Sequence, residues 1–482
     1  MPQMYPKGEP EETIRPSIGG EDGGGGATIL ALTICSAAIG GTFQYGYNIS
    51  IINAPTSYIQ TFINDTYMER WGSGLESSQL TLMWTIIVSA FSLGGLLGAL
   101  LAGPLSVRFG RKNSLLLNNG FLFAGAVLVL TSRVAKSFEM IIFARFQVGI
   151  NSGVSMNVQP MYFGYLLIDR GDKDACVKAL GKLRGGVAPI LEVEEMLEEQ
   201  EQQKTAALNS GSSANKTPWT LFKDAGLRSQ LRTVMAASSA MMLCGNDSIY
   251  FYAYYIFLAA GIPPQMIQYI TIGTGASEFT ASILSNLLIE RVGRRYLLIG
   301  GYSLMSFWSV VFTVALNLQS RGVAGMAYLS MACVFAYILS FGLGPAGVSG
   351  ILPAEIFDQS ARPAAYMVAG SCMWVSLFLV GMLFPFIVKG LGDFCFLPFF
   401  VVCVASAVFL GLTLPETKGK TLAEITADFD GRNGKKKEYS DVEMDEPLKQ
   451  LYQLGKAASL TNLMLDPDSK PDLESIQPQV NV

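Results

Sequence analysis

The sequence predicts an all-α membrane protein with about ten membrane-crossing helices, grouped as bundles of four and six. Three observations lead to this prediction. Half of the 482 residues are hydrophobic and only 15% are charged, whereas a water-soluble chain carries about 25% charged residues. Apolar runs of about 20 residues, the length that crosses a bilayer as a helix, recur along the chain. A short basic motif occurs twice, which indicates an internal repeat.

Each expected span is an apolar run bounded by polar or basic residues. The runs lie near 28–52, 80–103, 114–133, 138–161, 233–258, 266–289, 296–317, 324–347, 364–388 and 392–413. The expected domains are a disordered N-terminus (1–27), a four-helix bundle (28–164), a helical insert and linker (165–232), a six-helix bundle (233–413) and a C-terminal tail (414–482).

Lysine and arginine set the expected orientation. One set of loops holds seventeen basic residues and the opposite set holds five. Because basic loops stay on the cytoplasmic side, we expect both termini, the insert and the tail to be cytoplasmic in a multi-pass protein of the plasma membrane. The sequon Asn64-Asp65-Thr66 then lies in an outer loop, where Asn64 is a candidate for N-glycosylation.

The composition also excludes several chemistries. The chain has no histidine, and its seven cysteines form no Cys-x-x-Cys pair. We therefore expect no metal and no cofactor, and no motif indicates an enzyme. A net charge of -4 does not favour a nucleic-acid partner. The expected partners are membrane lipid and a small molecule.

The repeated motif reveals unequal halves. Arg108 to Lys112 reads RFGRK and Arg291 to Arg295 reads RVGRR, and each follows the second span of its bundle. In the second half, an acid–base loop from Glu355 to Pro363 follows the fourth span and Pro415-Glu416-Thr417 closes the bundle. The first half has neither after Gly164. We therefore expect two helices to be absent at the junction of Gly164 and Tyr165.

Several further motifs occur in combination. They are Gln44 to Asn48 with Asn53-Ala54-Pro55, Pro160-Met161-Tyr162, Gly344 to Gly347 and the closing PETKGKT. Over residues 28–425 the chain resembles the facilitative hexose transporters, solute carrier family 2 of the major facilitator superfamily, and most of all their fructose-handling class. The resemblance implies the twelve-helix major facilitator fold, here without helices five and six.

The resemblance also implies a function. A hexose, glucose or fructose, would be held between two bundles that open alternately to each side, in a uniport without ATP. The shortened first bundle implies that transport is impaired. Two alternatives remain: a membrane isoform that does not transport, and a proton-coupled sugar symporter.

Candidate substrate-binding residues lie inside the apolar spans. A carboxylate there costs about 2.5–3.5 kcal/mol at a helix centre, so Asp247 and Glu278 are expected to be functional. Asn246, Tyr250 and Tyr254 recur on one helix face, Tyr252 lies among them, and Trp374 can stack on a sugar ring. The alternative is polar pairing between helices without a ligand. By the resemblance, Met241, Met242, Gly350, Met373 and Leu377 replace the polar or aromatic residues that bind sugar in the family.

Opposite charges gather at the cytoplasmic ends of the helices. By the resemblance, these form a gating network: Arg108, Arg111, Glu290, Arg291, Arg294, Arg295, Glu355, Arg362 and Glu416. The alternative is that the basic residues only set the topology. Because two helices are expected to be absent, we also expect the small-residue face Gly94 to Gly98 to be partly without neighbours.

Overall fold

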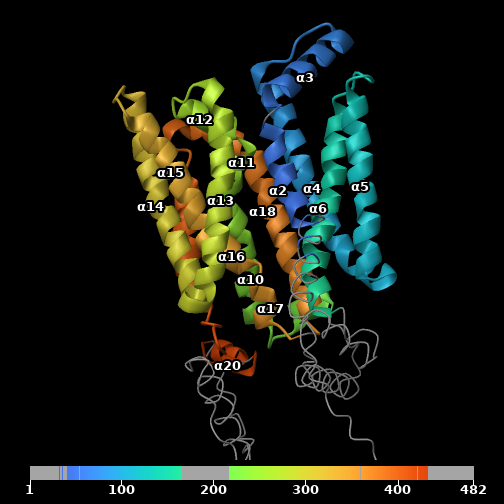
Figure 1. Cartoon of the computed structure of the whole chain (residues 1–482), viewed down its shortest axis with the longest axis vertical. Coiled ribbons are helices and arrows are strands. Elements are labelled where there is room, and N and C mark those ends of the chain that lie inside the picture. The colour runs from blue at the N-terminus through green and yellow to red at the C-terminus, as the bar shows by residue number, and fades with distance from the viewer. Residues whose placement is uncertain are drawn as a thin grey trace, which may run out of the picture. The chain divides into compact units, whose positions relative to one another are not determined.

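The computed structural model describes residues 41–53, 55–165, 217–358, 360–420 and 422–432, together with Leu32, Cys35 and Ile39. The expected N-terminal domain, most of the expected insert and most of the tail lie outside these residues. Every regular element in the described part is a helix (Figure 1). The all-α prediction is therefore confirmed for this part of the chain.

The first bundle contains four helices that match the predicted spans. They are α2 (Thr42–Ser50), which η1 (Ile51–Asn53) continues, α4 (Ser77–Phe109), α5 (Arg111–Ser132) and α6 (Glu139–Tyr165). A further helix, α3 (Thr56–Trp71), fills the loop that precedes α4 and was not predicted. Helix α4 starts at a capping box, in which the Glu76 main-chain N–H donates to the Gln79 side chain over 3.2 Å.

The second bundle follows a short helix, α9 (Pro218–Lys223), and ends before another, α20 (Leu422–Arg432). Its elements are α10 (Arg228–Leu243), α11 (Asn246–Phe251), α12 (Ala253–Ala259), α13 (Pro264–Val292), α14 (Arg294–Ser320), α15 (Met326–Phe341), the π-helical turn η2 (Gly342–Ala346), α16 (Gly347–Ser349), α17 (Leu352–Ile356), α18 (Arg362–Leu391), η3 (Gly392–Phe394) and α19 (Leu397–Thr413).

Five segments of the described chain are long and apolar enough to cross a membrane. They are Ser77–Ser106, Lys112–Ser132, Arg294–Ser320, Met326–Ile356 and Arg362–Phe394. Helix α19 is apolar but shorter. The total of ten spans stays a prediction.

The predicted span 233–258 is not one continuous helix. It breaks between α10 and α11, where Gly245 has a φ of 89°. A side chain at Gly245 would also overlap the Phe399 ring. The Tyr337 hydroxyl donates a hydrogen bond to the carbonyl of Cys244, a group that the break leaves without its helical partner. The break places Asn246 to Tyr250 in a separate short helix.

The three glycines of the small-residue face of α4 all have close neighbours, so the expectation that this face is partly without neighbours was wrong. A Cβ on Gly94 would overlap the main chain of Phe146, and a Cβ on Gly153 would overlap that of Gly95. Helices α4 and α6 are therefore in main-chain contact, which only glycine permits. The side of Gly95 that faces away from α6 is covered by the ring of Trp374 from the second bundle.

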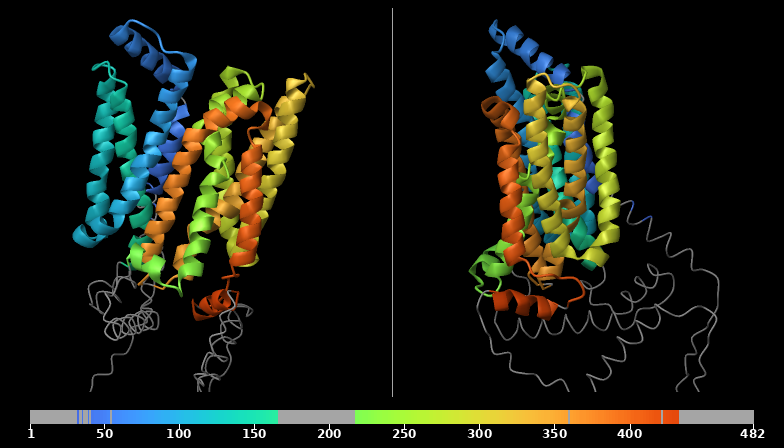
Figure 2. Two further views of the ribbon diagram at one scale, coloured as in Figure 1. Left: turned by 180° about the vertical axis from the view of Figure 1, so that it is seen from behind. Right: turned by 90° about the vertical axis from the view of Figure 1, so that its left-hand side faces the viewer.

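The two bundles meet along α4, α6 and α18. Met367 of α18 lies over Gly103 of α4, and Asn157 of α6 lies against Gly370 of α18. Figure 1 and the left view of Figure 2 show α3 and α12 at one end of the bundles and α9, α17 and α20 at the other. In the described part of the chain, α3, from one set of loops, therefore lies at the opposite end from α9 and α17, from the other set.

Candidate functional site

A buried polar cluster lies on α11, just after the break. Asn246 is fully buried, and Asp247 and Tyr250 are 6% and 7% exposed. Both amide atoms of Asn246, one oxygen of Asp247 and the Tyr250 hydroxyl have no hydrogen-bond partner among the described residues. Buried polar groups are normally paired, so several unpaired groups in one place indicate a site that a ligand or water completes.

Two further groups face this cluster from other helices. Glu278 of α13 is half-buried and lies close enough to Asp247 and to the Tyr250 hydroxyl to interact electrostatically. The Tyr45 hydroxyl of α2 interacts with both carboxylates. The predicted binding residues of α11 and α13 are thus brought together, and a tyrosine of the first bundle joins them.

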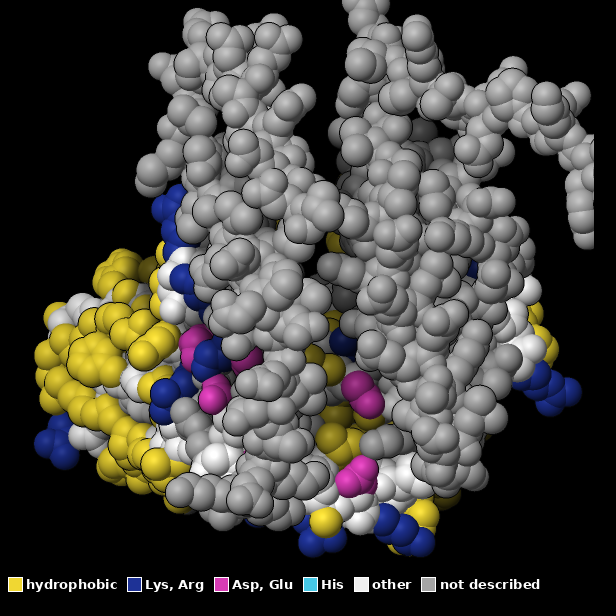
Figure 3. Space-filling view, turned by 90° about the horizontal axis from the view of Figure 1, so that it is seen from below, with side chains coloured by type: hydrophobic (Ala, Val, Ile, Leu, Met, Phe, Trp, Pro, Cys, Tyr) yellow, Lys and Arg dark blue, Asp and Glu magenta, His cyan; other side chains and the backbone are white. Residues whose placement is uncertain are grey.

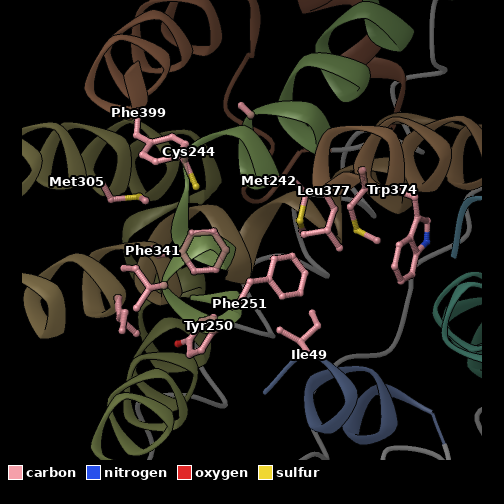
Figure 4. Packing of buried hydrophobic residues seen from close by; sticks show 14 of the residues in the cluster. Ile49, Met242, Cys244, Tyr250, Phe251, Met305, Phe341, Trp374, Leu377 and Phe399 are labelled. Atoms are coloured by element: carbon pink, nitrogen blue, oxygen red, sulfur yellow. The ribbon is translucent and has the colours of Figure 1, made fainter. Parts of the chain in front are cut away.

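An aromatic group lies between the bundles, and Tyr45 connects it to the cluster. Trp374 is fully buried, and its ring centroid is 5.6 Å from those of both Tyr45 and Phe91, edge to face. Its indole N–H has no hydrogen-bond partner among the described residues. Figure 4 shows Trp374 on α18, and it shows Phe251 of α11 beside Ile49 of α2. Sequence reasoning missed Tyr45 and Phe91, although Tyr45 belongs to the Gln44 to Asn48 motif.

Tyr252 and Tyr254, the two other tyrosines proposed for the site, contact groups outside the polar cluster. The Tyr252 hydroxyl donates to the Gly381 carbonyl over 2.7 Å, which ties α11 to α18. Tyr254 is half-buried and packs edge to face with Tyr255. Because its hydroxyl is already engaged with main chain, Tyr252 holds the helices together in this structure.

The charged residues of the second bundle form a network around Arg294. Its guanidinium donates to Glu290 over 2.7 Å and to Glu355 over 2.9 Å. Glu355 also accepts a hydrogen bond from the Thr417 hydroxyl over 2.7 Å. These contacts join α13, α14, α17 and the segment after α19. In the left half of Figure 3, basic and acidic side chains lie side by side at this end.

Glu416 caps the start of α14. Its two carboxylate oxygens accept the main-chain N–H groups of Arg294 over 2.9 Å and of Arg295 over 3.1 Å. Gly293, with a φ of 99°, lies so close to this carboxylate that a Cβ would meet it at 2.7 Å. A carboxylate at a helix N-terminus is stabilised by the free N–H groups and by the helix dipole.

The glycine turn at Gly293 has a counterpart at Gly110 in the first bundle, but there no described carboxylate caps the helix that follows. Gly110 has a φ of 74° and a ψ of 159°, and Gly293 has the same ψ. No carboxylate among the described residues caps α5 after Gly110, and a Cβ at Gly110 would meet nothing within 4 Å. The repeat predicted from the two basic motifs therefore extends to the backbone conformation, while the acid is present in one half only.

The remaining gating candidates make weaker contacts. Arg108 is exposed, with its guanidinium 5.6 Å from the ring centroid of Phe109. The side chain of Arg111 lies outside the described residues. The Arg291 carbonyl accepts from Lys418 over 2.7 Å, and Arg362 donates to the Phe357 carbonyl over 3.3 Å. The structure thus gathers Glu290, Arg294, Arg295, Glu355 and Glu416 and leaves these others outside that network.

A groove of about 1300 Å³ opens in the first bundle between α2, α3, α5 and α6. Arg145 lines it and is 6% exposed. One guanidinium nitrogen donates to the Asn48 carbonyl over 2.6 Å, and the guanidinium carbon lies 4.7 Å from the Phe91 ring centroid. Its other two nitrogens have no hydrogen-bond partner among the described residues.

Asn64 lies within α3, half-buried. Its side-chain oxygen accepts the main-chain N–H of Leu75 over 3.0 Å, and Thr66 of the same sequon is buried. Glycosylation at Asn64 stays a prediction.

Known proteins that resemble the chain agree on one family. The family described as "Sugar (and other) transporter" matches residues 33–166 and 164–429. Human solute carrier family 2, facilitated glucose transporter member 11 is 48% identical over 468 positions, covering 83% of this chain and 93% of the human protein. Human member 5 is 37% identical over 482 positions, covering 86% and 95%.

Solved structures match the fold. The proton:xylose symporter XylE of the major facilitator superfamily, bound to 6-bromo-6-deoxy-D-glucose, aligns with a TM-score of 0.69 over 84% of this chain and 100% of the symporter chain, at 19% identity. At this identity the likeness extends to the fold alone. With the family match over most of its length and the close relatives in one carrier family, this chain belongs to the sugar transporter family and has the major facilitator fold.

Proposed function

We propose that the chain is built for facilitative uniport of hexoses, glucose or fructose, across the plasma membrane, with both termini cytoplasmic. The observation that carries the proposal is the cluster of unpaired buried polar groups on α11, which Tyr45 connects to Trp374 at the junction of the two bundles. Similarity to facilitated glucose transporter members 11 and 5 supports the substrate class.

The side chains at this junction suit a sugar. Amide, carboxylate and phenol groups of Asn246, Asp247 and Tyr250 can bond hydroxyls, and an aromatic face such as that of Trp374 suits the apolar face of a sugar ring. Sites of this kind bury an apolar ligand face and fix its orientation with a few polar groups. Asp247 and Glu278 are the proposed substrate contacts from the second bundle.

The contacts between the bundles suit alternating access. Two rigid bundles that pack along α4 and α18 can rock about that seam, since glycine contacts such as Gly95 with Trp374 allow close approach without interlocking side chains. We propose that the network of Glu290, Arg294, Glu355 and Glu416 holds the cytoplasmic ends of α13, α14 and α17 together as one unit during this motion.

We further propose that two helices are missing after Gly164, which would impair transport. The family match falls in two segments that meet at residues 164–166. Since 83% of 482 residues is about 400, roughly 70 of the 468 positions aligned with human member 11 have no residue in this chain, enough for two helices of about 20 residues with loops.

The groove beside Arg145 supports the same proposal. It lies between α2, α5 and α6, and it contains a buried guanidinium with two unpaired nitrogens. Lipid tails can fill an apolar groove but cannot accept hydrogen bonds from Arg145. A membrane protein that does not transport is therefore the second candidate function for the chain as it stands.

The test uses a version of the chain with helices five and six of human member 11 inserted between Gly164 and Tyr165. In proteoliposomes this version should take up D-glucose or D-fructose but not L-glucose. Asp247→Leu and Glu278→Leu should each abolish uptake at unchanged membrane expression. Full uptake by both variants would place the two carboxylates outside the binding site.

A further inference from the structure

We infer that the site around Asp247 and Glu278 selects sugars that carry a positive charge, namely protonated amino sugars, over neutral hexoses. The inference rests on the proposed sugar-binding function and goes beyond it by assigning the charge of the preferred substrate.

The site carries two acidic side chains. Asp247 and Glu278 come from different helices and lie close enough to interact with each other. No lysine or arginine among the described residues forms an ion pair with either of them. Arg145, the buried arginine of the first bundle, bonds the Asn48 carbonyl and stacks on Phe91 instead. Within the described part of the chain, the site therefore has two acids and no cation.

Leaving these two acids unpaired costs free energy. An ionised carboxylate removed from water is stable only when another charge or several hydrogen bonds compensate it. Asp247 is 6% exposed, and one of its oxygens has no hydrogen-bond partner among the described residues. A cationic group of a ligand placed between the two carboxylates would supply the compensation that the protein lacks.

The neutral polar groups beside the two acids indicate what else the ligand carries. Asn246 is fully buried with both amide atoms unpaired, and the Tyr250 hydroxyl faces Glu278. Amide and hydroxyl groups match the neutral hydroxyls of a ligand. No group of three possible metal ligands occurs among the described residues. A polyhydroxylated organic ammonium fits this combination, and an amino sugar is such a molecule.

A ligand can reach the carboxylate of Glu278. Glu278 is half-buried, so its carboxylate can be reached. A Cβ added at Gly275, one turn before Glu278 on the same face of α13, would meet no atom within 4 Å. Glu278 thus borders free volume.

The test is calorimetric titration of the purified 482-residue chain in lipid nanodiscs at pH 6.5, where the amine of glucosamine is protonated. The probes are D-glucosamine, D-glucose and N-acetyl-D-glucosamine. N-acetylation keeps nitrogen at the same carbon but removes its charge. A hydrogen bond to a charged group contributes about ten- to a hundredfold in affinity, so glucosamine should bind more tightly than both neutral sugars by that factor.

Substitutions at the two acids test whether they cause the preference for glucosamine. Asp247→Asn and Glu278→Gln should each reduce the ratio of glucosamine affinity to D-glucose affinity about tenfold. Asp65→Asn, an exposed acid on α3, is the matched control and should leave the preference unchanged. Equal affinities for glucosamine and glucose on the unmodified chain would overturn the inference and leave the proposed function intact. Failure of all three sugars to bind would also overturn the inference, whereas the proposed function is tested separately by uptake through the version with two helices restored.

Discussion

The Glu416 carboxylate accepts a hydrogen bond from the main-chain N–H of Arg294 over 2.9 Å, although 122 positions separate the two residues. This contact holds the segment after α19 against the start of α14, within the second bundle. The first bundle has the same glycine turn at Gly110 but no acid over it among the described residues. The contrast between the two halves underlies the proposal that the first bundle is incomplete.

The cap is expected to stabilise the second bundle. Glu416→Ala removes a charged acceptor from two N–H groups, so we expect it to lower stability by about 1.5–3 kcal/mol. The measurement is the melting temperature of the purified protein in detergent. Asp65→Ala, an exposed acid on α3, should have no effect. Equal melting temperatures for the two variants would show that the cap contributes nothing.

The main-chain contact between α4 and α6 makes a second prediction. Gly153→Ala places a methyl group against the Gly95 carbonyl and should destabilise the protein by about 1–3 kcal/mol through overpacking. The matched control is Gly120→Ala on α5, where a Cβ meets nothing within 4 Å. This control should stabilise by up to about 1 kcal/mol, because alanine favours helices. Melting temperatures that shift in the same direction would contradict the close contact.

The orientation of the bundles is tested by labelling. Tyr58 and Lys223 are exposed, and they belong to α3 and α9, which lie at opposite ends of the bundles (Figure 1, Figure 2). In intact cells, a membrane-impermeant maleimide should label Tyr58→Cys and should reach Lys223→Cys only after permeabilisation. The unmodified chain gives the background from its own cysteines. Labelling of both variants in intact cells would refute the cytoplasmic placement of α9.

Sequence reasoning located the helices because apolar length is a local property. The structure has helices in the described part of every predicted span. The break at Gly245 was missed because a glycine inside an apolar run is common, and its left-handed conformation depends on Phe399 and Tyr337. The contacts of Gly95 were missed because they come from Trp374, nearly 300 positions away.

The candidate site was predictable in part for a similar reason. Asp247 and Glu278 stand out because a carboxylate in an apolar span is costly, wherever its partners are. Tyr45 and Phe91 carry no such signal, since aromatic residues are ordinary in membrane helices. Their role follows from the packing of α2 and α4 against α18, which no local pattern contains.

Hexose uptake by the chain as it stands tests the central claim most directly. The purified 482-residue chain and the version with two helices restored after Gly164 are reconstituted at equal density, and D-glucose and D-fructose uptake is measured against L-glucose. We predict saturable, stereoselective uptake by the restored version and none above protein-free vesicles by the unmodified chain. Comparable saturable uptake by both would contradict the account, because a first bundle of four helices would then be sufficient for transport.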